Sequence, residues 1–231
     1  MAKSKIITDL ANDDVSLEVV LKRITILTSD FEDKTIFTWA QNELGGYSDD
    51  ADIPKYRILH GEIRGSFQIA GYGFVQTQSN AKLPTIGFER EDVDHFCSTK
   101  FFQGISALRD LASNDSCCRS LPMESFPLFE HGTNITILSA KITFVKSQIQ
   151  SILSKIESVS LNILIELEKN YGNLDSLDIE QKATQTQNTI EKELVKIIYE
   201  DNRIQIGDNN KISKTDISTG IRGFFKGKNK K

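Results

Sequence analysis

Residues 147–171, SQIQSILSKIESVSLNILIELEKNY, predict one long amphipathic helix around which the chain folds. Its apolar side chains recur at steps of three and four, which places them on one helix face: Ile149, Ile152, Leu153, Ile156, Val159, Ile163, Leu164 and Leu167. Ser147 and Gln150 have the spacing of a capping box, and Gly172 can adopt the left-handed conformation that ends a helix. Burying one such side chain contributes about 1.5–3 kcal/mol, so we expect this stripe to lie in a core or an interface.

The N-terminal part of the chain is helical by the same criterion. Residues 13–45 predict two helices joined by a short link, which should pack as an antiparallel hairpin. Trp39 and Glu43 lie one turn apart on the second helix. The simplest interpretation of this pair is structural, with Trp39 filling the core and Glu43 bonding a nearby backbone N–H group.

The centre of the chain contains period-two segments. Residues 56–77 alternate apolar and polar side chains, and GYGF at 71–74 indicates a turn into a second, shorter strand. Residues 82–88 predict another short strand at a sheet edge. Residues 113–120, SNDSCCRS, predict a polar loop, and residues 135–145 predict a strand that leads into the long helix.

These elements predict an α+β fold. We expect a small antiparallel sheet packed against helices, an N-terminal helical hairpin, one long helix in the C-terminal half and a short C-terminal β segment. The predicted divisions are a domain over residues 1–178, a linker or short helix over 179–200, and a β-hairpin-like segment with a basic tail over 201–231.

The C-terminal β segment predicts assembly. Four isoleucines flank a GDNN turn in the manner of a hairpin or one rung of a stacked β structure: Ile204, Ile206, Ile212 and Ile217. A hairpin alone is marginal in water, so this segment should pair with the body or with another subunit. A homo-oligomer is therefore expected.

Charge is distributed unevenly along the chain. Residues 201–231 hold 8 Lys or Arg against 3 Asp, whereas the remaining residues hold 20 against 29 acidic residues. The basic side chains at the end of the chain are Arg222, Lys226, Lys228, Lys230 and Lys231, beside Phe224 and Phe225. A tail of this composition can bind nucleic acid or an anionic membrane. The alternative interpretation is that it only keeps the chain soluble. An odd number of cysteines and no apolar membrane-length run favour a cytoplasmic protein.

Catalytic motifs are sparse. The histidines, His60, His95 and His131, fall in three separate predicted elements, and no Ser or Cys lies in a G-x-S-x-G elbow. Cys97 and the Cys117-Cys118 pair lack the spacing of a zinc site, and glycine-rich phosphate loops are absent from the sequence. We therefore expect no metal, no cofactor and no catalytic residue. The acidic cluster at 89–94 leaves a metal-dependent nuclease open as an alternative.

Several segments in order resemble the AbiTii domain family. They are SLEVVLKRITIL, WAQNELGGY, IPKYR, FFQGISALRDL and NILIELEKNYGNLD, which together extend over about residues 5–178. The most specific positions are Trp39, Glu43, Gly46 and Tyr47, followed by Tyr56 and Arg57. The resemblance implies a role in abortive infection, in which an infected bacterium stops growing before phage are released. It implies no catalytic residues.

Two classes of function follow. The first is a defence protein without catalysis, which assembles with itself and binds a phage or host component. The second is a toxin, either a nuclease that uses acidic residues or a protein that acts on membranes through the basic, aromatic tail.

Overall fold

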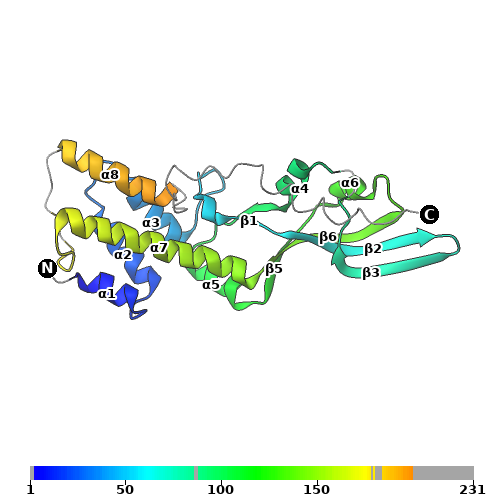
Figure 1. Ribbon diagram of the computed structural model, residues 1–231, viewed down its shortest axis with the longest axis horizontal. Helices are drawn as coiled ribbons and strands as arrows, with labels where there is room; N and C mark the ends of the chain where they lie inside the picture. Colours follow the sequence, from blue (N-terminus) through cyan, green and yellow to red (C-terminus); the bar gives the residue numbers. More distant parts are fainter. Residues whose placement is uncertain (1–2, 86–87, 178, 180–183, 200–231) are drawn as a thin grey trace, which may run out of the picture. The chain divides into compact units, whose positions relative to one another are not determined.

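The fold is α+β, as the sequence predicts. The computed structural model describes residues 3–85, 88–177, 179 and 184–199 (Figure 1). Helices gather around one long helix, α7, and the sheet strand β6 (Ile135–Val145) continues directly into that helix. One continuous stretch of chain therefore links the helical part to the sheet.

Helix α7, Lys146–Tyr171, carries the core of the helical part. Its buried side chains follow the predicted stripe: Ile149, Ile152, Ile156, Val159, Ile163, Leu164 and Leu167. The helices packed against it are α1 (Lys5–Ala11), α2 (Leu17–Leu27), α5 (Ile105–Ser113) and α8 (Thr184–Tyr199). The prediction that this stripe lies in a core is confirmed.

The two ends of α7 differ in how well the sequence predicts them. Gly172 follows the last turn with φ of 85° and donates its N–H to the carbonyl of Glu168, as expected of a C-terminal cap. The prediction that Ser147 and Gln150 form the capping box is wrong. The helix begins one residue earlier, so Gln148 occupies the third position and accepts a hydrogen bond from the Val145 N–H at 3.0 Å.

The predicted N-terminal hairpin is confirmed as α2 packed against α3 (Thr35–Gly45). Helix α1 has no counterpart in the sequence prediction because it is only 7 residues long. Its start is held by Glu168 of α7, which accepts hydrogen bonds from the Ser4 N–H at 2.6 Å and the Ser4 hydroxyl at 2.7 Å. Lys3 pairs with the same carboxylate at 2.6 Å.

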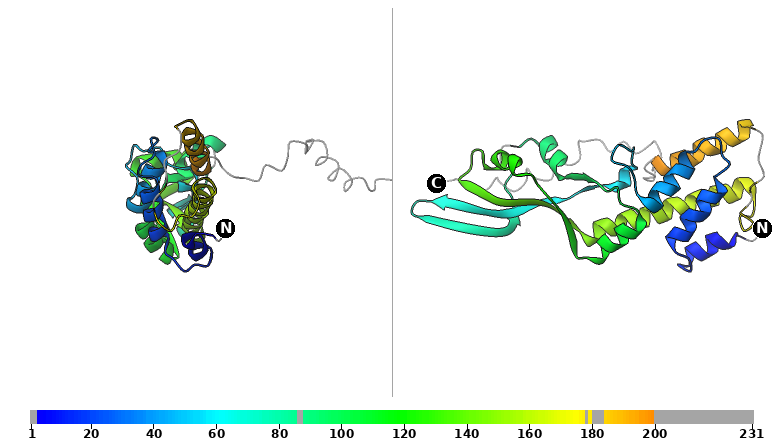
Figure 2. Two further views of the ribbon diagram at one scale, coloured as in Figure 1. Left: turned by 90° about the vertical axis from the view of Figure 1, so that its left-hand side faces the viewer. Right: turned by 180° about the vertical axis from the view of Figure 1, so that it is seen from behind.

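The strands form two antiparallel sheets. The larger has the order β3-β2-β6-β5, with β2 at Glu62–Gly71, β3 at Phe74–Lys82 and β5 at Ser116–Ser120 (Figure 2). The smaller pairs β1, Ile58–His60, with β4, Ser98–Lys100. The tight turn at Gly73, which has φ of 79°, joins β2 to β3 as the GYGF pattern predicts.

The first predicted strand is interrupted at Gly61. A 3₁₀ turn, Lys55–Arg57, precedes β1, and Gly61 then separates β1 from β2. A Cβ atom at Gly61 would lie 2.4 Å from Cγ2 of Ile142, and one at Gly65 would lie 2.1 Å from the Ser139 carbonyl oxygen. Both glycines therefore allow β6 to pass close to β2, as their place on the apolar face suggests.

Two segments were predicted wrongly. The described part of residues 82–88 contains no separate strand, because Lys82 ends β3 and residues 83–85 and 88 are irregular. Residues 113–120 are not simply a loop, because Ser116–Ser120 pair with β6, with Cys118 opposite Thr143. The polar composition of this strand reflects its position at the sheet edge, where most of its side chains are exposed.

The structure describes only part of the C-terminal region for which the sequence makes predictions. Residues 190–198 lie in helix α8, which packs against both α7 and α3. The four isoleucines proposed for assembly and the basic tail residues lie outside the described residues. The domain boundary at 178 and the segment over 201–231 stay predictions.

Candidate functional site

Glu43 and Arg57 form a buried ion pair at the centre of one residue cluster. Both side chains have no exposed surface, and the Arg57 Nε donates to Glu43 Oε1 and Oε2 at 3.1 and 3.2 Å. The Arg57 guanidinium also donates to Glu43 Oε2 through Nη2. The Tyr47 and Tyr56 hydroxyls each donate to Glu43 Oε1 at 2.7 Å, and the Trp39 indole N–H donates to the Tyr56 oxygen at 2.9 Å. We call these residues the Glu43 cluster.

The Glu43 cluster ties a distant segment to helix α3. The Arg57 Nη1 donates to the carbonyls of Phe101 and Gln103 at 2.9 and 2.7 Å. Tyr47 donates its backbone N–H to the Phe102 carbonyl at 2.7 Å. Residues 101–104 are the start of FFQGISALRDL, so three separate segments of the family resemblance meet here.

Gly46 is required where these segments cross. Its φ is 102°, and an added Cβ would lie 2.9 Å from the Phe102 carbonyl oxygen. Gly104 lies on the other side, where a Cβ would lie 2.4 Å from the Leu44 carbonyl oxygen. The two backbones therefore approach too closely for side chains at either position.

The structure brings together the residues that the sequence analysis named as a structural motif: Trp39, Glu43, Gly46, Tyr47, Tyr56 and Arg57. Trp39 is buried in the core, as expected. The expected partner of Glu43 is wrong, because the carboxylate bonds Arg57 and two tyrosines instead of a backbone N–H group. A single sequence gives no sign that Glu43 and Arg57 are partners.

Burial and charge keep Tyr47, Tyr56 and Arg57 of the Glu43 cluster protonated. Burial, followed by the nearby negative charge of Glu43, raises the pKa values of Tyr47 and Tyr56 well above their usual range. Burial disfavours the charged form of Arg57, yet its hydrogen bonds with Glu43 raise its pKa above the usual value. The tyrosines therefore remain phenols and the arginine remains a cation, which suits a structural role.

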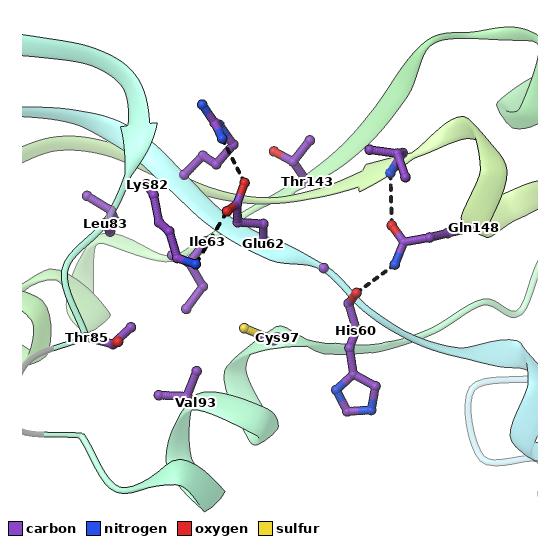
Figure 3. A pocket seen from close by; sticks show the side chains of 13 residues that line it. His60, Glu62, Ile63, Lys82, Leu83, Thr85, Val93, Cys97, Thr143 and Gln148 are labelled. Atoms are coloured by element: carbon purple, nitrogen blue, oxygen red, sulfur yellow. Dashed lines mark hydrogen bonds and ion pairs between the residues drawn. The ribbon is translucent and has the colours of Figure 1, made fainter. Parts of the chain in front are cut away.

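A second candidate site is a groove of about 680 Å³ between the start of β2 and helix α4 (Arg90–Cys97) (Figure 3). Apolar side chains of Ile63, Leu83, Val93 and Val145 line it together with Cys97. Polar groups lie beside them, so the groove has the mixed lining of a ligand or peptide site. We call it the β2–α4 groove.

The charged groups of the β2–α4 groove are paired with each other. Glu62 accepts a hydrogen bond from Arg64 at 2.7 Å and lies 3.5 Å from Lys82 Nζ, and Figure 3 shows Lys82 directed toward Glu62. The Arg64 hydrogen bond contributes most to lowering the pKa of Glu62 below its usual value. These side chains are partly exposed, so water or a ligand can compete for them.

The remaining polar groups connect the groove to the long helix. Gln148 accepts from the Val145 N–H and donates its amide N–H to the His60 carbonyl at 2.7 Å, as Figure 3 shows. In the described part of the chain, the buried hydroxyl oxygen of Thr143 has no hydrogen-bond partner. Burial, together with Asp94, raises the pKa of the Cys97 thiol. Cys97 is therefore a poor nucleophile near neutral pH.

The other sequence candidates are dispersed. His60 lies at the end of β1, His95 in α4, and His131 directly after α6 (Phe126–Glu130). Within the described ranges, no group of three His, Cys, Asp or Glu side chains could hold a metal ion. Glu91 and Asp92 lie in the first turn of α4, where acidic side chains favour a helix start. None of the helices in the described residues combines the length and the apolar composition of a membrane span.

A comparison with protein families identifies the family of this chain. No curated protein and no solved structure matches the chain. The AbiTii family model matches residues 4–192, which is most of the sequence and extends beyond residue 178 into helix α8. The chain therefore belongs to the AbiTii family, an abortive-infection domain family.

Proposed function

We propose that this protein acts in abortive-infection antiphage defence by assembling with copies of itself and by binding a phage or host component. The family supports the biological role. The β2–α4 groove supports binding, because it combines apolar surface with partly exposed charged groups. This groove is the observation on which the binding proposal rests.

The chemistry of the groove favours recognition over catalysis. A catalytic site needs a nucleophile or base that is activated by its neighbours. Cys97 has a raised pKa, which keeps its thiol protonated, and Glu62 is already bonded to Arg64. Groups in these states offer an apolar contact and exchangeable ion pairs, which are the features of a binding surface.

The occupant we propose for the groove is a segment of a phage or host protein. Val93 and Val145 would contact its apolar side chains, while Arg64 and Lys82 would exchange Glu62 for an acidic group of the ligand. Because those ion pairs are exposed, such an exchange costs little. We further propose that the basic tail residues bind nucleic acid or an anionic membrane.

A pair of variants on one helix tests the role of the groove. Val93→Lys places a long charged side chain in the groove, whereas His95→Lys adds the same side chain to α4 at an exposed position that does not line it. Cells that express each full chain are challenged with phage, and plaques are counted. We expect protection to be lost with Val93→Lys and kept with His95→Lys.

Folding must be measured for the same two variants. Circular dichroism and thermal melting should show similar folded states, so that a loss of protection reports the groove. Equal protection by native and Val93→Lys proteins of similar melting temperature would contradict a binding role for the groove.

The assembly proposal has a separate test. Light scattering coupled to size-exclusion chromatography gives the mass of the full chain over a range of concentrations, and of a chain that lacks residues 200–231. We expect a mass above that of a 26.0 kDa monomer for the full chain. A monomer at every concentration, unchanged by the deletion, would contradict assembly.

A further inference from the structure

Strand β3 forms an open edge of the larger sheet. It pairs with β2 on one side, and no strand in the described ranges pairs with its other side (Figure 2). Most of its side chains are exposed, and Tyr72, Phe74 and Val75 place large apolar side chains in solvent at the hairpin tip. An unpaired edge of this kind is a ready template for another strand.

The pairing with β2 fixes which backbone groups face outward. Ala70 of β2 donates its N–H to the Asn134 carbonyl at 3.0 Å, away from β3, and its partner across the hairpin is Val75. Residues opposite each other in an antiparallel pair alternate between bonded and non-bonded positions. Val75 and Thr77 therefore direct their N–H and C=O groups to the open edge.

The two edges of the sheet are protected to different degrees. Strand β5 is short, and its Arg119 donates to Thr99 Oγ1 at 3.2 Å and to the Phe96 carbonyl at 3.3 Å. Residues 74–81, FVQTQSNA, contain no charge, no proline and no glycine. Charge, proline and short length are the usual means of preventing edge pairing, so β3 lacks the protection that β5 has.

A bulge limits the length of the open edge. Asn80 has φ of 49°, and its carbonyl accepts hydrogen bonds from the Arg64 Nε at 3.1 Å and Nη2 at 2.7 Å. The register with β2 shifts at this point, which ends the regular part of the strand. The segment available for pairing is therefore residues 74–78.

We propose that β3 pairs with β3 of a second copy of this chain, antiparallel and with Gln76 opposite Gln76. This inference rests on the proposed self-assembly and assigns a surface to it. In that register the backbone of Val75 in one copy exchanges hydrogen bonds with the backbone of Thr77 in the other. The two Gln76 side-chain amides face each other. The strand is uncharged, so a two-fold pairing brings no like charges together, and β-branched side chains face each other across the new ladder.

Charge at position 76 tests the pairing in the full chain. Gln76→Lys places two lysines opposite each other, and we expect the apparent dissociation constant of the assembly to rise by about tenfold or more. Gln68→Lys is the matched control, because it adds the same charge to the same hairpin one strand away from the edge. Sedimentation velocity of native, Gln76→Lys and Gln68→Lys proteins measures the effect.

Mixing opposite charges identifies the partner as a second copy. Gln76→Lys and Gln76→Glu proteins should each dissociate alone and associate when combined. Unchanged assembly of Gln76→Lys overturns the inference while leaving self-assembly intact. Failure of the mixture to associate also overturns it and indicates another occupant, such as residues 203–217, whose deletion would then abolish assembly. A native chain that is monomeric at every concentration removes both proposals.

Discussion

Two of the Glu–Arg ion pairs among the described residues, Glu43–Arg57 and Glu62–Arg64, lie in contrasting surroundings. Glu43 and Arg57 are both 0% exposed, whereas Arg64 and Glu62 are 34% and 43% exposed. The buried carboxylate also accepts hydrogen bonds from Tyr47 and Tyr56. The exposed carboxylate is shared between Arg64 and Lys82 at the rim of the β2–α4 groove.

The difference shows how burial changes the role of the same two side chains. Removing a charged group from water costs several kcal/mol, so a buried charge is tolerated only when its partners satisfy it. The Glu43 cluster meets this condition and thereby fixes helix α3 against residues 101–104. The Glu62 pair has no such constraint, so it can exchange partners at little cost.

Removing one member of the buried pair should give the largest effect. Arg57→Ala leaves the Glu43 carboxylate buried without its counter-charge and frees the carbonyls of Phe101 and Gln103. We expect the free energy of unfolding to fall by about 3–5 kcal/mol. Urea unfolding followed by circular dichroism measures this change.

Replacing both members separates the charge from the packing. Glu43→Gln combined with Arg57→Met keeps similar volumes and removes both charges, so the double variant should be more stable than Arg57→Ala. A change of less than about 1 kcal/mol for Arg57→Ala would show that the two ion pairs do not differ as their burial indicates.

The backbone crossing beside the Glu43 cluster should give the next largest effect. Gly46→Ala combines a positive φ with a contact of 2.9 Å between the added Cβ and the Phe102 carbonyl oxygen. It should lower the free energy of unfolding by about 2–3 kcal/mol. Gly73→Ala is the matched control, because its φ is also positive but an added Cβ meets nothing within 4 Å. The control should cost about 1 kcal/mol, from backbone strain alone. Thermal melting of both variants tests the difference, and equal losses would contradict a steric role at Gly46.

The contrast also explains what the sequence could predict. The spacing of Ile149, Ile152 and Ile156 predicts a buried helix face because periodicity is a local property. The residues of the Glu43 cluster were identifiable through the family resemblance, but the Glu43–Arg57 contact depends on how the chain folds back between them. The β2–α4 groove was missed entirely, since its lining comes from several separate elements that share no sequence pattern. The pairing of polar Ser116–Ser120 with β6 was missed because an edge strand carries little apolar signal.

Glu168 provides an intermediate case between the two pairs. Its side chain is 12% exposed, beside Lys3 at 56%. Burial acts to raise its pKa, but hydrogen bonds from Lys3 and Ser4 lower it to about 2. A lowered folded-state pKa contributes stability that is present above the unfolded value of about 4.3 and is lost as the pH falls toward 2.

Glu168→Gln should therefore lower the free energy of unfolding by about 1 kcal/mol at pH 7. The difference in stability from the native chain should disappear near pH 2. Urea unfolding at several pH values between 2 and 7 measures this convergence. The fluorescence of Trp39, which lies far from this substitution in sequence and is the only tryptophan, gives an independent signal. A constant difference over the whole pH range would contradict a role for the Glu168 charge.

The smallest effect should come from the exposed pair. Arg64→Ala removes the shorter of the two ion pairs of Glu62 and the hydrogen bonds to the Asn80 carbonyl. These contacts are exposed, Lys82 remains near Glu62 and water replaces the lost hydrogen bonds, so stability should fall by no more than about 1 kcal/mol. The loss of stability caused by Arg64→Ala should be smaller still at high salt, because exposed charges are screened. Arg57→Ala measured at the same two salt concentrations is the matched control and should change little. If Arg64→Ala destabilised the protein as strongly as Arg57→Ala, Arg64 would be a structural residue. It would then not be an exchangeable contact at the rim of a binding groove.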